Sequence, residues 1–303
     1  QAMIAAAKLT RLSEDEARTL LEQIRWPLGP VCMKCGSINT HRMGGKAGAK
    51  GQIKCRDCRG KFTIRLGTIF EDTKLPLRKW FAAIWLITAH KKGIASTQLA
   101  KDIAVTQKTA WFMLHRLREA IRTQSFNRPL DGVVEADETF IGGKEKNKHR
   151  NKRTKGSQGG KGKAILLGVL ERGGELRTAE MPSLHMRHVV GHIEQHVKPG
   201  AIVVTDEHRS FAPLIGMYDH YVVKHAAGEY VRGDAHTNSI EGVWSLFKRQ
   251  IVGTHHWLSQ KHLDRYVQEM TWRFNRREMG EGGRVNALLA KTDGRLTYKA
   301  LIA

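Results

Sequence analysis

Two pairs of cysteines constrain the fold more than any other feature of this chain. Cys32 and Cys35 form one CxxC pair, Cys55 and Cys58 form another, and 19 residues separate the pairs. This spacing lets four thiolates meet in a tetrahedron, the ligand arrangement of a structural zinc ribbon. A redox or disulfide role is the alternative, but all four cysteines of the chain belong to this motif, so they imply no oxidising compartment. We therefore expect structural Zn²⁺ in a module too small to fold without it.

The charge balance predicts a polyanionic partner. The 303 residues include 51 Lys and Arg against 29 Asp and Glu, a net charge of +22, while a 41% hydrophobic fraction excludes wholesale disorder. We expect no membrane partner, because the longest apolar run, within 77–92, is short and flanked by charge. The opening residues show no secretory signal.

The order of helical, linker and strand patterns along the sequence predicts a multidomain α+β protein. Residues 12–26 read as a short helix that Ser13 and Glu16 begin as a capping box. A Lys- and Gly-rich stretch contains the cysteines, a strongly helical region follows, and FNRPLDG (126–132) reads as a linker. The expected domains are an N-terminal helix at 1–28, a zinc ribbon at 29–70, a helical DNA-binding region at 71–125 and an α/β domain at 130–303.

Strand patterns dominate the start of the last domain. We expect strands at 133–140, 164–174, 175–181 and 201–207, and helices at about 184–197, 237–251 and 260–277. The segment 142–163 carries nine Lys or Arg and one Glu without periodicity. It is predicted to be a mobile basic loop that binds phosphates through residues including Lys148, Arg150, Lys152 and Arg153. A merely solvated hairpin connection is the alternative.

Residues 91–121 contain two helical patterns around a tight break and predict a helix-turn-helix. Ala104 and Val105 would form the turn, and Thr106 would cap the second helix. A recognition helix enters the major groove with its N-terminal residues, so Gln107 and Lys108 are the first candidates for base contacts. Arg118 is expected on the same outward surface, together with Trp111 and His115; an ordinary helical hairpin is the alternative.

Three acidic residues in separate segments predict a metal-dependent active site. Asp137 and Asp206 end two apolar strand-like runs 69 residues apart, and Glu241 follows 35 residues later in a helical pattern. Two strand-end aspartates and a helical glutamate can converge on two divalent ions, which activate an attacking oxygen and stabilise a leaving oxygen in phosphoryl transfer. In so basic a chain, the phosphodiester would belong to DNA or RNA.

Several long stretches make the chain resemble the zinc-ribbon DDE transposases of bacterial insertion sequences, the ISXO-like group. The similarity runs from about 20 to 302 and includes CMKCGS, KCRDCRGKFTIRLGTIFEDTKLPLRKW, VEADETFIGGKEKNK, TDEH, HTNSIEGVWSLFKR and RYVQEMTWRFNRR. The resemblance implies an RNase H-like catalytic domain and a DNA transposase that cleaves and joins the inverted ends of a mobile element. It also implies double-stranded DNA as partner, a dimer or higher oligomer on DNA, and a bacterial cytoplasmic, nucleoid-associated location.

The resemblance assigns roles by position. Asp137, Asp206 and Glu241 match the DDE acids that would hold Mg²⁺ or Mn²⁺, and Lys248, with Arg249 beside it, matches a donor-DNA contact. Asn238, one helical turn before Glu241, is the alternative third ligand, but a carboxylate binds Mg²⁺ better than an amide.

Other residues near these motifs are weaker candidates. Glu138 is expected to point to the opposite face of its strand and to act structurally. His225, Tyr230, Arg232 and His236 flank or belong to the Gly-rich stretch 226–234 and are minor candidates for the site.

Two other functions fit parts of the pattern. A transposase-derived DNA-binding regulator would lack catalysis and respond to Mg²⁺ only through general salt effects. A related RNase H-like nuclease would not need the N-terminal ribbon and helix-turn-helix. The intact acids disfavour the first alternative, and the N-terminal modules disfavour the second.

Overall fold

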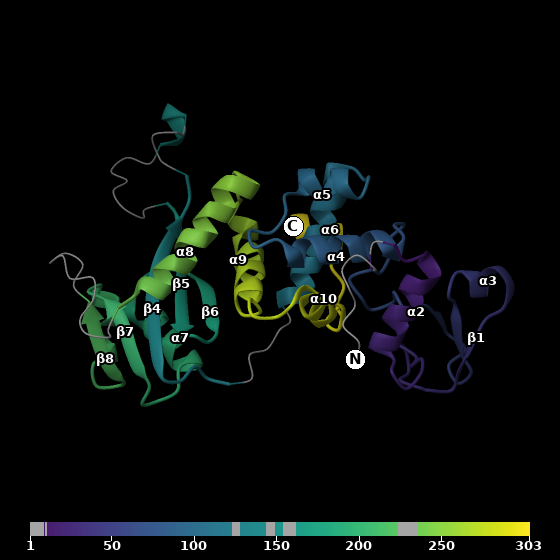
Figure 1. The fold of residues 1–303 in the computed structure, drawn as a ribbon, viewed down its shortest axis with the longest axis horizontal. Helices are drawn as coiled ribbons and strands as arrows, with labels where there is room; N and C mark the ends of the chain where they lie inside the picture. Colours follow the sequence, from purple (N-terminus) through teal and green to yellow (C-terminus); the bar gives the residue numbers. More distant parts are fainter. Residues whose placement is uncertain (1–8, 10, 123–127, 144–148, 154–161, 224–235) are drawn as a thin grey trace. The chain divides into compact units, whose positions relative to one another are not determined.

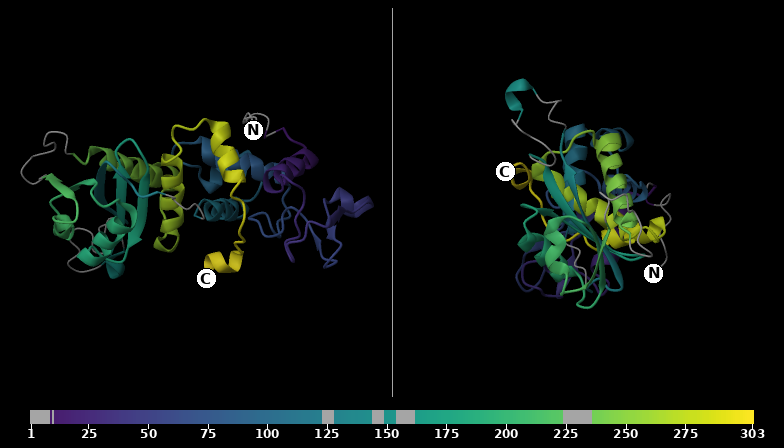
Figure 2. Two further views of the ribbon diagram at one scale, coloured as in Figure 1. Left: turned by 90° about the horizontal axis from the view of Figure 1, so that it is seen from below. Right: turned by 90° about the vertical axis from the view of Figure 1, so that its left-hand side faces the viewer.

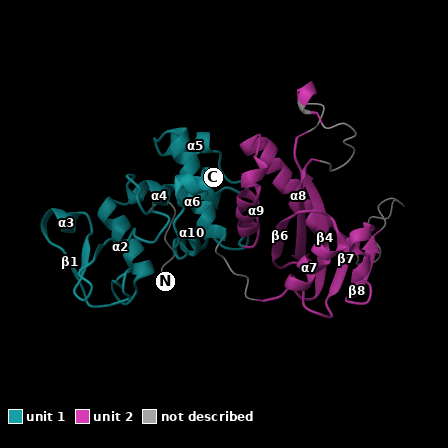
Figure 3. Ribbon diagram, turned by 180° about the vertical axis from the view of Figure 1, so that it is seen from behind, with its two compact units in different colours: residues 1–124, 276–303 teal, residues 125–275 magenta. Residues whose placement is uncertain are grey.

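The computed structural model describes residues 9, 11–122, 128–143, 149–153, 162–223 and 236–303. It divides into two compact units (Figure 3). Unit 1 comprises Gln1–Gln124 together with Arg276–Ala303, and unit 2 comprises Ser125–Asn275. This division differs from the expected one at the carboxyl end, because residues 276–303 cluster with unit 1 rather than with the α/β domain.

Unit 1 combines a small antiparallel sheet, in the order β1-β2-β3, with a group of helices (Figure 1). Its first helix begins as predicted, because the Ser13 hydroxyl accepts the Glu16 N–H and the Glu16 carboxylate accepts the Ser13 N–H. The elements are α2 (Glu14–Arg25), β1 (Thr40–Arg42), α3 (Gly45–Ala49), β2 (Ile53–Cys55), β3 (Lys61–Phe62), α4 (Leu77–Ala89), α5 (Ser96–Asp102), α6 (Gln107–Arg122), α10 (Glu281–Leu289) and α11 (Tyr298–Ile302).

Helices α5 and α6 form the expected pair around a tight turn. Ala104 has a φ of 50° at the turn, and the Thr106 hydroxyl accepts the Thr109 N–H at 3.2 Å. This bond satisfies one of the open N–H groups at the start of α6, as an N-cap residue does.

The carboxyl-terminal segment completes the core of unit 1. Helix α10 packs against α4 and buries Val285, and its yellow ribbon lies beside the blue helices of unit 1 in the left-hand view of Figure 2. The Ile69 N–H donates to the Thr292 carbonyl at 2.9 Å. The buried Arg116 guanidinium donates to the carbonyls of Ile69 and Leu296 at 2.9 and 3.1 Å. These bonds join backbone regions that the sequence separates widely.

Unit 2 is built on a mixed five-stranded sheet in the order β6-β5-β4-β7-β8. Strands β4, β5 and β6 pair antiparallel, whereas β4, β7 and β8 pair parallel. The elements are β4 (Val133–Ile141), η2 (Arg150–Lys152), β5 (Ala164–Glu171), β6 (Leu176–Met181), α7 (Met186–His196), β7 (Ile202–Asp206), η3 (Arg209–Leu214), β8 (Asp219–Val223), α8 (Asn238–Gln250), the π-helical turn η5 (Ile251–His255) and α9 (Gln260–Phe274).

Helices cover both faces of this sheet. One core joins Val134, Ala136 and Leu167 to α7, and the other joins Leu166 and Leu170 to α8 and α9. Burial of large side chains of α8, each worth about 1.5–3 kcal/mol, fixes that helix on the sheet; they are Ile240, Trp244 and Phe247. The mixed sheet with helices on both faces confirms the expected α/β class of this domain.

The predicted strands and helices of unit 2 are present, but β8 was not predicted from the sequence. None of the helices within the described ranges is long and apolar enough to cross a membrane.

Candidate active site and zinc centre

Strands β4 and β7 bring two of the predicted acids together, although Asp137 lies in the middle of β4 rather than at its predicted end. The two strands are parallel, and Glu135 of β4 lies opposite Val204 of β7. The same register, continued for two residues, brings Asp137 level with Asp206, the last residue of β7. The carboxyl ends of adjacent parallel strands in an open sheet are the usual edge for a binding crevice.

Asp137 lies on the sheet face that α8 covers. It pairs directly with Gly168 of β5, and directly paired residues share a face. A Cβ built at Gly168 would lie 2.6 Å from the Trp244 ring and 3.1 Å from Ile240 Cδ1, both on α8. Only glycine allows α8 to approach the sheet this closely, and the approach brings Glu241 to the edge where Asp137 lies.

An open cleft of about 610 Å³ joins these elements. Glu241 and Lys248, two turns apart on α8, line it together with Asp137 of β4. The other lining residues are Glu138, Thr139, Trp244, Ser245, Arg249 and Val252. Among the described residues Asn238 does not line this cleft, although it is exposed at the first position of α8.

Three carboxylates form a compact group, and two of them, Asp137 and Glu138, line the cleft. Asp137, Glu138 and Asp206 each present an oxygen within 4.8 Å of the other two. Glu241 lies outside this group, and its carboxylate accepts the Thr237 hydroxyl at 3.0 Å.

Glu138, predicted to be a structural partner, has its carboxylate closer to the other two acids than its strand position suggests. Its strand position does alternate away from Asp137, since it pairs with Leu167 of the α7 core. The pairing of β4 with β7 ends at Glu135. Beyond that point β4 remains paired with β5, and the Glu138 carboxylate lies within 4.8 Å of those of Asp137 and Asp206.

The negative charges of these three carboxylates favour the binding of a cation. Burial, followed by the charges of Asp206 and Glu241, raises the pKa of Asp137 to about 7. Burial, followed by the charges of Asp206 and Asp137, raises the pKa of Glu138 to about 8. The buried Oε2 atom of Glu138 has no hydrogen-bond partner. Hard carboxylate oxygens with this unbalanced negative charge fit Mg²⁺ or Mn²⁺.

One residue at the site was missed by sequence reasoning. Glu135 lies two residues before Asp137 on the same strand face, fully buried, and accepts hydrogen bonds from the first turn of α8. An ionisable residue inside an apolar strand run was the available signal, because such a residue is buried only with partners.

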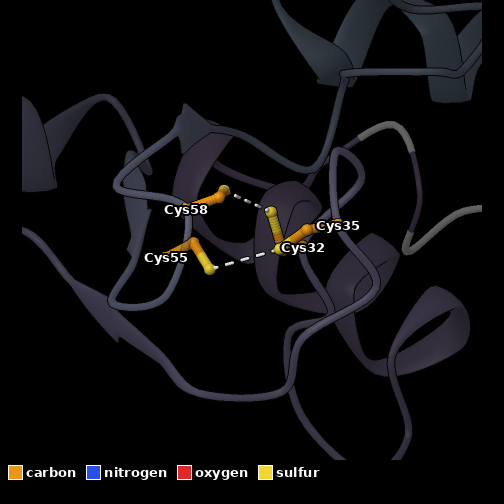
Figure 4. A group of neighbouring side chains, drawn as sticks. All are labelled: Cys32, Cys35, Cys55 and Cys58. Atoms are coloured by element: carbon orange, nitrogen blue, oxygen red, sulfur yellow. Dashed lines mark hydrogen bonds between the residues drawn. The ribbon is translucent and has the colours of Figure 1, made fainter.

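The four cysteines converge as predicted (Figure 4). The Sγ atoms of Cys32 and Cys58 are 3.6 Å apart, and those of Cys35 and Cys55 are 3.7 Å apart. Four thiolates about 2.3 Å from a tetrahedral zinc ion have sulfurs about 3.8 Å apart. A hydrogen bond from the backbone of Lys34 lowers the pKa of Cys32 to about 7. The donor set and spacing fit Zn²⁺.

The predicted DNA contacts on α6 divide by position. Gln107 and Lys108 are exposed in the first turn, and the Lys108 ammonium lies 5.0 Å from the ring centre of Tyr298. The prediction for Arg118 is wrong, because its side chain is fully buried, as is that of His115. Helix α6 is buried around most of its circumference from Ala110 onward and has no single outward stripe.

The remaining basic candidates lie in unit 2. Lys248 and Arg249 line the cleft, and Arg150 and Arg153 are exposed at and beside η2, which ends at Lys152. Lys148, His225, Tyr230 and Arg232 lie outside the described residues.

Comparison with known proteins identifies the family. Residues 129–275 match the ISXO2-like transposase domain, and residues 12–61 match the transposase zinc-ribbon domain. An uncharacterized protein in transposable element ISH50 of Halobacterium salinarum is 30% identical over 271 residues, covering 86% of this chain and 90% of that protein. This chain belongs to the ISXO2-like transposase family. The expected family is therefore confirmed, and this ISXO2-like transposase is an enzyme of the DDE class.

Other relatives are more distant. An uncharacterized transposase-like protein of Haemophilus influenzae is 27% identical over 103 residues, covering 34% of this ISXO2-like transposase and 82% of that protein. A chain in the crystal structure of the Mos1 strand transfer complex is 11% identical in sequence to this one. The comparison covers 72% of this chain and 79% of that chain, with a TM-score of 0.25. The pre-cleavage Mos1 transpososome also has a TM-score of 0.25, at 12% identity, over 96% of this chain and 98% of that chain. The family assignment rests on the sequence matches.

Proposed function

We propose that this ISXO2-like transposase cleaves the inverted ends of an insertion sequence and joins them to target DNA at the cleft between β4 and α8, beside Asp206. The observation that carries the proposal is the meeting of Asp137 and Asp206 at one sheet edge, with Glu241 on the helix that lines the same cleft. Phosphoryl transfer needs little covalent chemistry from the protein, so positioned carboxylates and cations suffice.

Asp137, Asp206 and Glu241 are the proposed ligands for Mg²⁺ or Mn²⁺. Divalent ions bound there lower the pKa of an attacking water or 3′-hydroxyl and offset charge on the leaving oxygen. The raised pKa of Asp137 supports this role, because burial and the charges of Asp206 and Glu241 outweigh the opposing charge of Lys248. Glu138 shares the carboxylate group, so it belongs in the test. Asn238 is the alternative third ligand, and its absence from the cleft lining favours Glu241.

The basic residues would hold DNA. Lys248 and Arg249 line the cleft beside the carboxylates, where their charges suit phosphates next to the scissile bond. The zinc ribbon and the first turn of α6, with Gln107 and Lys108, would bind the element's terminal repeat. Pairing two ends requires at least a dimer on DNA, and the bacterial nucleoid is the proposed place of action.

A strand-transfer assay tests the proposal. A labelled duplex from the element's end would be incubated with supercoiled plasmid in Mg²⁺, Mn²⁺ or EDTA, using wild type and the variants Asp137→Asn, Asp206→Asn and Glu241→Gln. We expect joining only with metal and none by the three variants, while DNA binding persists. Asn238→Ala is the matched control on α8 and should remain active.

The outcomes separate the alternatives. Joining that survives Glu241→Gln but not Asn238→Ala would move the third ligand to Asn238. Cleavage without joining would favour the nuclease, and metal-indifferent binding without cleavage would favour the regulator.

A further inference from the structure

Glu135 is a fully buried carboxylate that no role proposed above uses. It lies on the face of β4 that packs against α8, two residues before Asp137. A buried charge is costly unless it is paired and hydrogen-bonded, so its contacts indicate what it does.

Both oxygens of Glu135 bind the start of α8. Oε2 accepts the backbone N–H groups of Ser239 and Ile240 at 2.9 and 3.0 Å. Oε1 accepts the Ser239 hydroxyl at 2.9 Å and the Arg172 Nε–H at 3.0 Å. Arg172 therefore pairs the charge, while the positive end of the helix dipole adds to the attraction.

These bonds replace an ordinary helix cap. Thr237 occupies the N-cap position of α8, but its side chain makes no capping bond and its hydroxyl donates to Glu241 instead. The open N–H groups of a first helical turn need acceptors, and here the acceptor comes from the neighbouring strand. The cap thus ties the turn that contains Glu241 to the strand that contains Asp137.

We propose that Glu135 is a positioning residue that fixes Glu241 relative to Asp137, so that both can bind the same pair of divalent ions. This inference rests on the proposed function, in which Glu241 is a metal ligand. The charge of Glu135 is offset by Arg172 and by the backbone N–H groups of α8. Glu135 therefore sets the geometry of the metal ligands without binding the metal itself.

The test is a double-mutant cycle on Mn²⁺ affinity, measured by calorimetry on the full-length protein without DNA. Glu135→Gln keeps the size of the side chain but replaces one acceptor oxygen with a donor. We expect it to weaken Mn²⁺ binding about tenfold or more, as loss of an orienting partner does. In a Glu241→Gln background the same change should have almost no effect, because the ligand that Glu135 positions is gone.

Two further variants guard the interpretation. Glu171→Gln removes another carboxylate–guanidinium pair of unit 2, with Arg128 at 2.6 Å, and should leave Mn²⁺ affinity unchanged. If Glu135→Gln does not fold, Ser239→Ala removes one bond of the same cap and should weaken Mn²⁺ binding about threefold, again only when Glu241 is present.

The failures are distinguishable. Equal losses in both backgrounds, or a lowered melting temperature with unchanged Mn²⁺ affinity, would overturn the positioning role and leave Glu135 a purely structural cap. Glu241→Gln with wild-type Mn²⁺ affinity would instead overturn Glu241 as a ligand, and with it the proposed function as written.

Discussion

Burial and two neighbouring carboxylates raise the pKa of Asp137 from 3.8 to about 7. The folded-state pKa therefore lies above that of the unfolded chain. The stability this group contributes is fully present below about pH 4 and is lost as the pH rises through about 7. At higher pH the metal-free protein retains a buried charge that metal would neutralise.

Replacing this charge should stabilise the metal-free protein and end catalysis. We expect Asp137→Asn to raise the free energy of unfolding at pH 8 in EDTA by on the order of 1–4 kcal/mol, with little gain at pH 4. Urea unfolding at the two pH values measures this. Asp131→Asn is the control, because the Lys198 side chain lowers the pKa of Asp131. A stability gain for Asp137→Asn that is equal at both pH values would contradict the electrostatic explanation.

The same pKa predicts a pH-dependent metal affinity. Mn²⁺ must displace a proton from Asp137 below pH 7, so affinity should rise with pH by up to about tenfold per unit between pH 5.5 and 7. Glu138, with a pKa of about 8, should extend the rise above pH 7. Calorimetric titrations at several pH values measure the slope. A flat profile in the wild type would show that neither carboxylate binds the ion.

The sequence could predict the acids that follow apolar runs, although Asp137 lies within β4 rather than at its end. It could not predict the acids whose roles depend on packing. Asp137 and Asp206 stand at the ends of apolar runs, where parallel strands deliver side chains to a common edge. Glu138 joins them from a strand position that alternates away from Asp137, past the last paired residue of β4 and β7. The role of Glu135 depends on where α8 begins relative to β4, which no local sequence pattern specifies.

At the scale of elements, the contact between β5 and α8 sets the geometry of the cleft. Gly168 lets Trp244 approach the backbone opposite Asp137. Trp244 is buried among core residues, so it cannot move aside easily.

Gly168→Ala should push α8 away from the sheet. The added methyl group would meet the Trp244 ring at 2.6 Å, so we expect a loss of about 1–3 kcal/mol in stability together with reduced strand transfer. Gly191→Ala, on α7, is the matched control: it meets nothing within 4 Å, and alanine in a helix should be neutral or stabilising by up to about 1 kcal/mol. Equal behaviour of the two variants in both assays would contradict the close-packing argument.

Element prediction succeeded where periodicity was strong and failed where burial was unusual. The capping box of α2 and the strands from β4 to β7 follow from local sequence. Strand β8 is short and lies at the edge of the sheet with much of its surface exposed, so it lacks a clear apolar pattern. Helix α6 was expected to have one covered face, but a helix buried on most sides carries His115 and Arg118 into the interior.

At the scale of the whole molecule, the zinc centre and the acidic cleft belong to different units. Cys35→Ser should therefore abolish zinc binding and weaken binding of the element's end, while Mn²⁺ affinity stays as in the wild type. Metal analysis, a gel-shift assay and calorimetry measure the three properties. Lys34→Ala, between the same two cysteines, should keep its zinc. A parallel loss of zinc and Mn²⁺ affinity in Cys35→Ser would show that the two centres depend on each other.

Because residues 276–303 belong to unit 1, unit 1 can complete its fold only after unit 2 has been synthesised. Unit 2 lies between the two segments of unit 1 in the sequence. All residues of unit 2 therefore emerge from the ribosome before residues 276–303 of unit 1. Until then Arg116 lacks the Leu296 carbonyl, and α4 lacks α10. A nascent chain stopped after Asn275 would thus contain the complete cleft, whereas unit 1 would still lack residues 276–303.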